Sequence, residues 1–279
     1  MPTAQTPKVV ALLPAWNAGD FITETLQSLA AQSWPNFEVL VSVDQSTDET
    51  ADICKRFATD DDRFKIIEQK ERLGWIGNVN ALLDAAEGDY YLIAYHDDVL
   101  DPAHVQSLAP LLDSRPEAVV AYGDIRAHYL TGDVIERAYY EIDGVRDPAQ
   151  RAGSIIRRKG YWSTPNHGLF RASAVEATGG FRRHSGGEFS ADWPWLLKMA
   201  LLGEFVRAPY FLCDKYYKSA SLSHNWSWDF REFAGVFEEC ARVIRASALP
   251  VPVKARLSAL LAAEFLKEQG RKGFANLKR

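Results

Sequence analysis

Short apolar runs alternate with amphipathic segments along the first 125 residues, and this order constrains the fold more than any other feature. Apolar runs of this length are typical of buried strands, and the segments between them show helical spacing. Strands separated by helices pair in parallel through right-handed crossovers, which predicts an α/β fold with a mostly parallel central sheet flanked by helices. The predicted strands are 8–16, 36–44, 63–69, 89–95 and 118–125, and the predicted helices are 20–34, 46–58, 75–88 and 101–116.

The regular alternation stops near residue 125. No linker or internal repeat interrupts the chain, so we predict one domain over residues 1–279. Glycine and proline mark the expected ends of the later elements. These are a hairpin at 126–140 that turns at 131–133, a short helix closed by Gly179 and Gly180, a helix at 190–203, a strand at 210–217, and C-terminal helices at 230–247 and 252–270.

Composition excludes several classes of protein. With 279 residues, 47% hydrophobic and 25% charged, the chain can bury a substantial core, and no low-complexity tract indicates disorder. Its apolar runs are too short to span a bilayer, and the N-terminal residues lack the features of a signal peptide. Three widely spaced cysteines without a Cys-x-x-Cys pair disfavour a disulfide framework and a structural zinc site. These features predict a soluble, cytoplasmic protein.

Charge is distributed unevenly along the chain. Residues 1–100 hold 17 acidic and 7 basic side chains, whereas residues 101–279 hold 20 acidic and 25 basic ones. No basic stripe of the kind that binds nucleic acid is present, so no nucleic-acid partner is expected. The segment from Pro250 onward is basic, and two interpretations stay open. It forms either a solvated helix face or a peripheral contact with the anionic inner face of a membrane.

Polar or kinked segments follow three of the predicted strands, at 14–17, 44–48 and 96–98. Ligands of parallel sheets bind beyond the carboxyl ends of the strands, so these segments are the candidate site. The glycine-rich signatures of dinucleotide-binding and P-loop proteins are missing from the sequence, as is the Gly-x-Ser-x-Gly turn of α/β hydrolases. All three classes are therefore disfavoured.

Two adjacent carboxylates, Asp97 and Asp98, follow the apolar run "YYLIAY" and His96. Their mutual repulsion requires compensation by solvent, a basic partner or a metal ion. A hard cation such as Mg²⁺ or Mn²⁺ binds a few carboxylate oxygens and completes its shell with phosphate oxygens. The alternative is a turn and a helix cap before Asp101 and Pro102, and the residue types alone do not decide between the two.

Four segments, at 9–17, 36–50, 73–98 and 177–203, together resemble a family 2 glycosyltransferase of the GT-A (Rossmann-like) fold. The resemblance covers about residues 8–218. It implies a UDP-sugar donor, a divalent cation (Mn²⁺ or Mg²⁺), a saccharide or lipid-linked acceptor, inversion at the transferred carbon, and a role in surface polysaccharide synthesis. It also implies a nucleotide-sugar-binding half at 8–124, an acceptor-binding half at 125–225 and a C-terminal helical extension at 226–279.

The resemblance assigns the donor site residue by residue. Segment 14–17 is similar to the Pro-Thr-Tyr-Asn that wraps the nucleoside, and Asp44 matches the residue that pairs with a uridine-type base. The family's Asp-x-Asp signature falls on Tyr95, His96 and Asp97, so a tyrosine replaces its first acid. The nucleotide-sugar-binding residues implied in this way are Pro14, Ala15, Trp16, Asn17, Asp44, Gly74, Asn78, Asn80, His96, Asp97 and Lys218.

The metal ligands implied by the resemblance are Asp97, Asp98 and His224, with Asp97 ahead of Asp98. Related enzymes place a histidine near the diphosphate or the metal, in the segment after the last strand. In register this position falls on Lys218, whereas His224 lies six residues later. Either residue therefore remains a candidate for the diphosphate contact.

Asp192 matches the second acid of the family's Glu-Asp motif, with Ala191 in place of the glutamate. The resemblance implies that Asp192 is the general base that deprotonates the acceptor hydroxyl, and a helix N-cap is the alternative explanation. Sugars stack on aromatic rings, and the segment around His167 lies where the family lines its acceptor pocket. The candidate acceptor-binding residues are Trp162, His167, Trp193 and Trp226.

Two other functions compete with this interpretation. A sugar nucleotidyltransferase also combines a nucleotide-binding α/β sheet with a metal, but it needs a basic glycine-rich loop after the first strand, and 14–21 contains no lysine or arginine. A non-catalytic nucleotide- or sugar-binding protein on the same scaffold would explain the missing first acid at Tyr95.

Overall fold

The computed structural model describes residues 6–218 and 229–276, and the elements named here lie within those ranges. Its strands are β1 Val9–Ala15, β2 Phe37–Val43, β3 Phe64–Glu68, β4 Tyr90–Ile93, β5 Asp98–Leu100, β6 Ala118–His128, β7 Val134–Arg137, β8 Leu169–Arg171 and β9 Glu204–Tyr216. Its helices are α1 Ile22–Ala30, α2 Thr50–Asp60, α3 Gly74–Ala85, α4 His104–Asp113, α5 Pro148–Arg157, the 3-10 turn η1 Thr164–His167, α6 Ala172–Thr178, α7 Asp192–Leu202, α9 Phe230–Ala246 and α10 Val251–Asn276.

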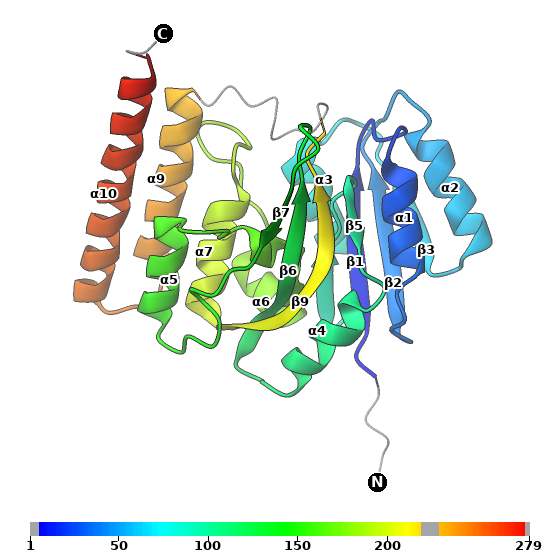
Figure 1. Cartoon of the computed structure of the whole chain (residues 1–279), viewed down its shortest axis with the longest axis horizontal. Coiled ribbons are helices and arrows are strands. Elements are labelled where there is room, and N and C mark those ends of the chain that lie inside the picture. Colours follow the sequence, from blue (N-terminus) through cyan, green and yellow to red (C-terminus); the bar gives the residue numbers. More distant parts are fainter. Residues whose placement is uncertain (1–5, 219–228, 277–279) are drawn as a thin grey trace.

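One nine-stranded sheet organises these residues, in the order β3-β2-β1-β4-β8-β6-β9-β5, with β7 paired to β6. The adjacent strands β3, β2, β1 and β4 are parallel to one another, and β6 is parallel to β9. The short strands β5, β7 and β8 are antiparallel to theirs. The predicted α/β fold, with a mostly parallel central sheet and C-terminal helices, is confirmed (Figure 1).

Helices cover both faces of the sheet at β1, which is buried along its whole length. Val9 and Leu13 belong to one apolar cluster, to which α1, α2 and α4 contribute. Val10 and Leu12 belong to a second cluster, to which α3, α5, α6, α7, α9 and α10 contribute. Because both faces are covered, the strand is continuously apolar instead of alternating, which is why the sequence pattern identified it.

The sheet curls so that its last strand, β5, returns toward the helix that follows β1. Although β5 stands at the opposite end of the strand order from β3, the Thr25 hydroxyl of α1 donates a hydrogen bond to the Asp98 carbonyl at 2.7 Å. Adjacent strands are each rotated in the same sense, and over many strands this rotation accumulates into curvature. The curl brings Asp98 close to the carboxyl end of β1.

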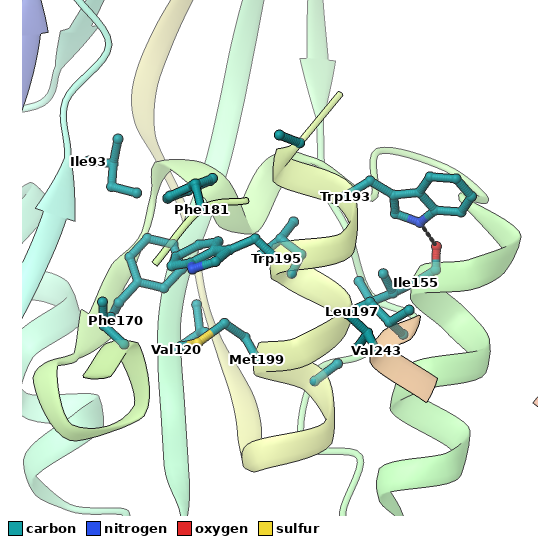
Figure 2. Close-up of a cluster of buried hydrophobic side chains, with 14 of the residues drawn as sticks. Ile93, Val120, Ile155, Phe170, Phe181, Trp193, Trp195, Leu197, Met199 and Val243 are labelled. Carbon is teal, nitrogen blue, oxygen red and sulfur yellow. Dashed lines mark hydrogen bonds between the residues drawn. The ribbon is translucent and has the colours of Figure 1, made fainter. Parts of the chain in front are cut away.

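α7 is the central helix of the second apolar cluster and packs against α5 and α9 (Figure 2). The Trp195 ring stacks on Phe181 with centroids 4.5 Å apart and meets Phe170 edge-on at 4.7 Å. On another face of the helix, the Trp193 indole N–H donates to the Ile155 carbonyl at 2.9 Å. This packing fixes the N-terminus of α7, where Asp192 lies.

α9 and α10 pack against each other beside α5 (Figure 1). The Phe233 and Phe265 rings stack at 5.6 Å between the two helices. Among the helices in the described ranges, none combines the length and the apolar character that crossing a membrane requires. The contact of the basic C-terminal helix with a membrane surface stays a prediction.

Several elements differ from those expected from the sequence. The predicted hairpin at 126–140 is confirmed. Its strands β6 and β7 pair antiparallel, and across the turn the Tyr129 amide donates to the Asp133 carbonyl at 2.9 Å. The three-residue strands β5 and β8 were not predicted, since so short a segment has no measurable period. Helix α5 was not predicted, although Asp147 caps it by accepting from the Ala149 amide at 2.8 Å. The sequence pair Asp147-Pro148 is the signal that could have identified it.

Candidate active site

The loops after β1 and β2 are tied together at the carboxyl edge of the sheet. The Asn17 amide donates to the Ser46 hydroxyl at 3.0 Å, and the Asn17 side-chain oxygen accepts from the Thr47 amide at 2.9 Å. Asn17 and Gln45 both have positive φ, a backbone conformation that residues other than glycine rarely adopt and that the surroundings must stabilise. Asn17 therefore fixes the loop that carries Pro14, Ala15 and Trp16.

Asp44, at the end of β2, is fully buried and holds the loop before α3. Its carboxylate accepts from the Leu73 amide at 2.7 Å and the Gly74 amide at 2.9 Å, and it pairs with Arg72. Both oxygens are engaged within the chain, so Asp44 shapes this subsite through the loop that it anchors. At Gly74, φ is +76° and a Cβ atom would lie 2.8 Å from the Glu188 carboxylate, which explains the glycine.

Arg72 completes the subsite, and sequence reasoning missed it. Its guanidinium lies 3.9 Å from the centre of the Trp16 ring, in a cation–π contact. The paired ring and guanidinium form a flat surface of the kind on which a nucleobase stacks. An arginine two residues before Gly74 was the only sequence signal for this role, and its contacts with Asp44 and Trp16 join loops that are distant in the chain.

Replacing Asp44 with Asn should lower the free energy of unfolding by about 1.5–3 kcal/mol, because hydrogen bonds to a charged group are lost in a buried place. The loop that holds Arg72 would loosen, so affinity for UDP should fall as well. Urea denaturation and calorimetry with UDP measure the two effects. The exposed Asp62, replaced with Asn, is the matched control. Wild-type stability of the Asp44 variant would contradict this assignment.

Asn78 and Asn80 make hydrogen bonds within the fold, and their role in nucleotide-sugar binding stays a prediction. The buried Asn78 amide donates to the Ser42 carbonyl at 3.1 Å. Asn80 exchanges two hydrogen bonds, both of 2.9 Å, with the Phe181 backbone. These hydrogen bonds hold α3 to the sheet and to the segment after α6.

His96, Asp97 and Lys218 border the space beside the first loop. The His96 ring contacts the Pro14 carbonyl through Nδ1 at 3.1 Å and lies 5.4 Å from the Phe21 ring. The Lys218 ammonium lies 4.4 Å from the centre of the same Phe21 ring. Asp97 is half-buried in the turn between β4 and β5. A cation and a carboxylate thus lie close to the loop that carries Pro14, Ala15 and Trp16.

Asp98 differs from Asp97 because its carboxylate is buried, with 2% of the residue exposed. Its oxygens lie 3.3 Å from the Tyr216 amide and 3.1 Å from His167 Nδ1, and Lys215 is its cross-strand neighbour in the β5–β9 pair. Burial acts to raise the pKa of Asp98, but the Lys215 charge and the His167 contact outweigh it, so this pKa is lowered. A basic partner within the protein therefore compensates Asp98, and the Asp101 carboxylate accepts from the Ala103 amide at 2.8 Å in the turn before α4.

Lys215 is a second functional residue that sequence reasoning missed. Its ammonium lies 5.6 Å from the centre of the Tyr95 ring and 5.5 Å from that of Tyr217. Burial acts to lower the pKa of Lys215, but the charges of Asp98 and Asp97 outweigh it and raise this pKa above the ordinary value. Lys215 is therefore charged at every physiological pH, and it interacts electrostatically with the two carboxylates of the turn and with Asp192.

The donor atoms at this edge fit a hard divalent cation at Asp97. Asp97 offers carboxylate oxygens at the surface of the turn, as Mg²⁺ and Mn²⁺ prefer. Asp98 is engaged internally, and its cluster with His167 and Cys213, whose ligand atoms lie within 4.8 Å of one another, offers mixed oxygen, nitrogen and sulfur atoms that such a cation does not favour. His224 lies outside the described residues.

Asp192 is the first residue of α7 and is half-buried. Its carboxylate accepts from the Asn166 side-chain amide at 2.7 Å. Burial raises the pKa of Asp192, against the opposing effects of the Asn166 hydrogen bond and the Lys215 charge. Ala191 is the N-cap of α7 and makes no side-chain capping bond, whereas the backbone amides of Asp192 and Trp193 also act to lower the pKa of the Asp192 carboxyl.

Tyr95 interacts electrostatically with Asp192 and with both carboxylates of the turn between β4 and β5. Burial, followed by the charges of Asp192, Asp98 and Asp97, raises the pKa of Tyr95 well above its ordinary value. The phenol is therefore neutral and lies within electrostatic range of all three carboxylates. Asn166 was missed by sequence reasoning, since only the fold brings η1 to the head of α7, 26 residues further along the chain.

The four candidate acceptor-binding residues differ in their burial and contacts. Trp162 is half-buried beside the Trp193 ring at 6.4 Å and stays a candidate. The Trp193 indole is fully buried and bonded to Ile155, so this expectation is corrected to a core residue (Figure 2). His167 is buried against Asp98 and serves the interior of the site. Trp226 lies outside the described residues.

Solved structures share this fold. A fragment of S. aureus TarS in complex with UDP-GlcNAc aligns with a TM-score of 0.75 and 19% identity, covering 91% of this chain and 71% of that one. A mannosyltransferase from Pyrobaculum calidifontis, in complex with GDP-Man and Mn²⁺, aligns with a TM-score of 0.61 and 19% identity, covering 96% of this chain and 76% of that one. These likenesses show the fold, which is that of the GT-A glycosyltransferases.

Curated relatives match parts of the sequence. An uncharacterized glycosyltransferase of Haemophilus influenzae is 30% identical over 139 residues, which cover 46% of this chain and 43% of the relative. A GalNAc(5)-diNAcBac-PP-undecaprenol beta-1,3-glucosyltransferase of Campylobacter jejuni is 32% identical over 95 residues, covering 34% of this chain and 31% of the relative. The chain thus spans less than half the length of these relatives. The sequence model described as Glycosyl transferase family 2 matches residues 11–175, more than half of the 279 residues. With this match and the GT-A fold, the chain belongs to glycosyl transferase family 2.

Proposed function

We propose that this protein transfers a sugar from a nucleotide-diphospho-sugar, with UDP as the nucleotide, to a hydroxyl group of a saccharide or lipid-linked acceptor. The observation that carries the proposal is Asp192, whose pKa is raised by burial and whose carboxylate is oriented by Asn166. A carboxylate of raised pKa is a stronger base, and the Lys215 charge that acts on Asp192 also interacts with Asp98 and Asp97 in the turn.

The transfer is a single displacement. The Asp192 carboxylate accepts the proton of the acceptor hydroxyl while the acceptor oxygen forms a bond to the anomeric carbon. The bond between that carbon and the diphosphate oxygen breaks, and the diphosphate leaves with the electron pair. Attack from the side opposite the leaving group inverts the anomeric centre. Asn166 is a positioning residue, because its amide donates to one Asp192 oxygen at 2.7 Å, while the Ser190 hydroxyl lies 3.5 Å from the other.

The negative charge that develops on the diphosphate is the main cost of the reaction, and fixed positive groups reduce it. Lys218 stands at the end of β9 beside Phe21, and Lys215 lies next to the turn of Asp97. A divalent cation held by Asp97 would supply further charge to the diphosphate oxygens. The Pyrobaculum mannosyltransferase, which shares the fold, is in complex with Mn²⁺ as well as its nucleotide sugar, and this supports the cofactor.

The names of the relatives support the proposed class of acceptor and the proposed pathway. The Campylobacter relative is named for a lipid-linked acceptor, and a relative in Bacillus subtilis is named as a putative teichuronic acid biosynthesis glycosyltransferase. We propose a role in the synthesis of a surface polysaccharide on the cytoplasmic side. The basic side chains of α10, such as Lys254 and Arg256, would favour a peripheral contact with an anionic membrane.

Donor hydrolysis measured across a panel of UDP- and GDP-sugars, with and without Mn²⁺, tests the proposal. We expect UDP release from at least one UDP-sugar, faster with Mn²⁺, and thermal stabilisation by the same compound. Release of pyrophosphate from UTP and a sugar phosphate would indicate a nucleotidyltransferase instead. UDP binding without any hydrolysis and without a Mn²⁺ effect would indicate a binding protein.

A further inference from the structure

A separate cleft of about 320 Å³ lies between the end of α6, one face of α7 and α9. Pro194, Trp195 and Lys198 of α7 line it, whereas Asp192 does not, so it opens on a different face of that helix from the active site. Its volume falls within the range of small-ligand pockets. Phe181 and Val243 add apolar surface to its lining (Figure 2).

The charged residues of the cleft are three cations and one carboxylate. Glu239 is buried and is satisfied by Arg242, which donates from both Nε, at 2.8 Å, and a terminal nitrogen. Arg182 lies 3.7 Å from the same carboxylate, beyond hydrogen-bond distance. Once Glu239 and Arg242 neutralise each other, Arg182 and Lys198 leave an excess of two positive charges.

These two cations keep donors available. Lys198 donates to the Thr178 carbonyl at the end of α6, and within the described residues its ammonium has no second hydrogen-bond acceptor. The Arg182 guanidinium makes no hydrogen bond in the same part of the chain, and its side chain is 65% exposed. The Lys198 contact also neutralises the negative end of α6, which would otherwise repel an anion.

We propose that this cleft binds a phosphate group, either as free phosphate or as the phosphate of a lipid headgroup. A phosphate carries a charge close to the excess of the cleft and offers several acceptor oxygens to Arg182 and Lys198. Apolar walls make such contacts stronger than they would be in water. The surroundings agree, since burial and the neighbouring charges of Arg242 and Arg182 lower the pKa of Lys198, a crowding that an anion relieves. The site is independent of the proposed transfer reaction.

Calorimetric titration of the full chain with inorganic phosphate, at constant ionic strength and with saturating UDP to occupy the donor site, tests the proposal. Arg182→Gln should weaken phosphate binding at least about tenfold, because a hydrogen bond to a charged group is worth that much. Arg146→Gln removes an exposed cation outside the cleft and should bind as the wild type does. Lys198→Met is a second variant with the same expected loss.

A second arm distinguishes the source of the phosphate. Vesicles of phosphatidylcholine with phosphatidic acid, compared with phosphatidylcholine alone, are tested for sedimentation with the same variants. Saturable binding of inorganic phosphate that depends on Arg182 supports a soluble ligand, and binding only to the acidic vesicles, again dependent on Arg182, supports a headgroup. Equal binding by Arg182→Gln and Arg146→Gln in both arms, or no binding in either, overturns the proposal. Donor hydrolysis reports separately on the transfer reaction.

Discussion

Replacing Asp192 with Asn should lower turnover of the nucleotide-sugar donor to an acceptor by about 10²–10⁴-fold, the usual contribution of a positioned general base. The amide keeps the size of the carboxylate but cannot accept a proton at neutral pH. Asn is as good a helix cap as Asp, so a capping role predicts nearly wild-type turnover. Initial rates with saturating donor, and UDP affinity by calorimetry, separate the loss of chemistry from a loss of binding.

The same substitution has an expected effect on stability. Because the pKa of Asp192 is raised in the folded state, folding favours the protonated carboxyl, and the ionised form opposes folding at neutral pH. Removing the charge should therefore leave the free energy of unfolding unchanged or higher. In the wild type, turnover should increase as the pH rises through the raised pKa of Asp192. In the Asp192→Asn variant this pH dependence should be absent. Turnover within a few-fold of the wild type would rule out Asp192 as the base.

Replacing Lys215 with Met should lower the free energy of unfolding by about 3 kcal/mol, the lower end of the cost of leaving a buried charge uncompensated, because Lys215 is half-buried. Asp98 would keep its buried charge with only His167 beside it. Donor turnover should fall as well, since a positive charge next to the diphosphate subsite is lost. Urea denaturation and initial rates measure both effects, with the exposed Lys65→Met as control.

Two further variants identify the cause. Lys215→Arg keeps the charge and should retain most of the stability. The double variant Lys215→Met with Asp98→Asn removes the uncompensated carboxylate, so it should be more stable than Lys215→Met alone. If Lys215→Met unfolds at the wild-type urea concentration, His167 alone suffices to compensate Asp98 and the assigned role of Lys215 is wrong.

The sequence predicted the parallel part of the sheet well because buried parallel strands and amphipathic helices have local signatures. The run before Pro14, the strand that ends at Asp44 and the strand that ends before Asp97 all lie close to their predicted positions. Parallel pairing places their carboxyl ends at one edge, so the location of the candidate site followed without coordinates. The family resemblance added Asp192, which local pattern alone would have left as a helix cap.

The sequence was less informative about what each side chain does. Asn78 and Asn80 lie on the predicted helix near the predicted edge, yet their side-chain amides donate hydrogen bonds to the backbone carbonyls of Ser42 and Phe181. Trp193 has the residue type of a sugar contact but is enclosed by α5 and α9. Helical spacing does not say which neighbour covers a given face, because that depends on elements distant in the chain.

The amino-acid sequence by itself determined the α/β fold, the edge of the sheet that carries the site, and the presence there of Asp44, Asp97 and Asp98. The tertiary structure alone decided their electrostatic roles. Curling of the sheet pairs β5 with β9 and places Lys215 opposite Asp98, more than 100 residues away, and leaves Asp97 at the surface of the turn. The physical reason is that the state of a charged group depends on the burial and the charges around it, and these come from contacts that no local pattern encodes.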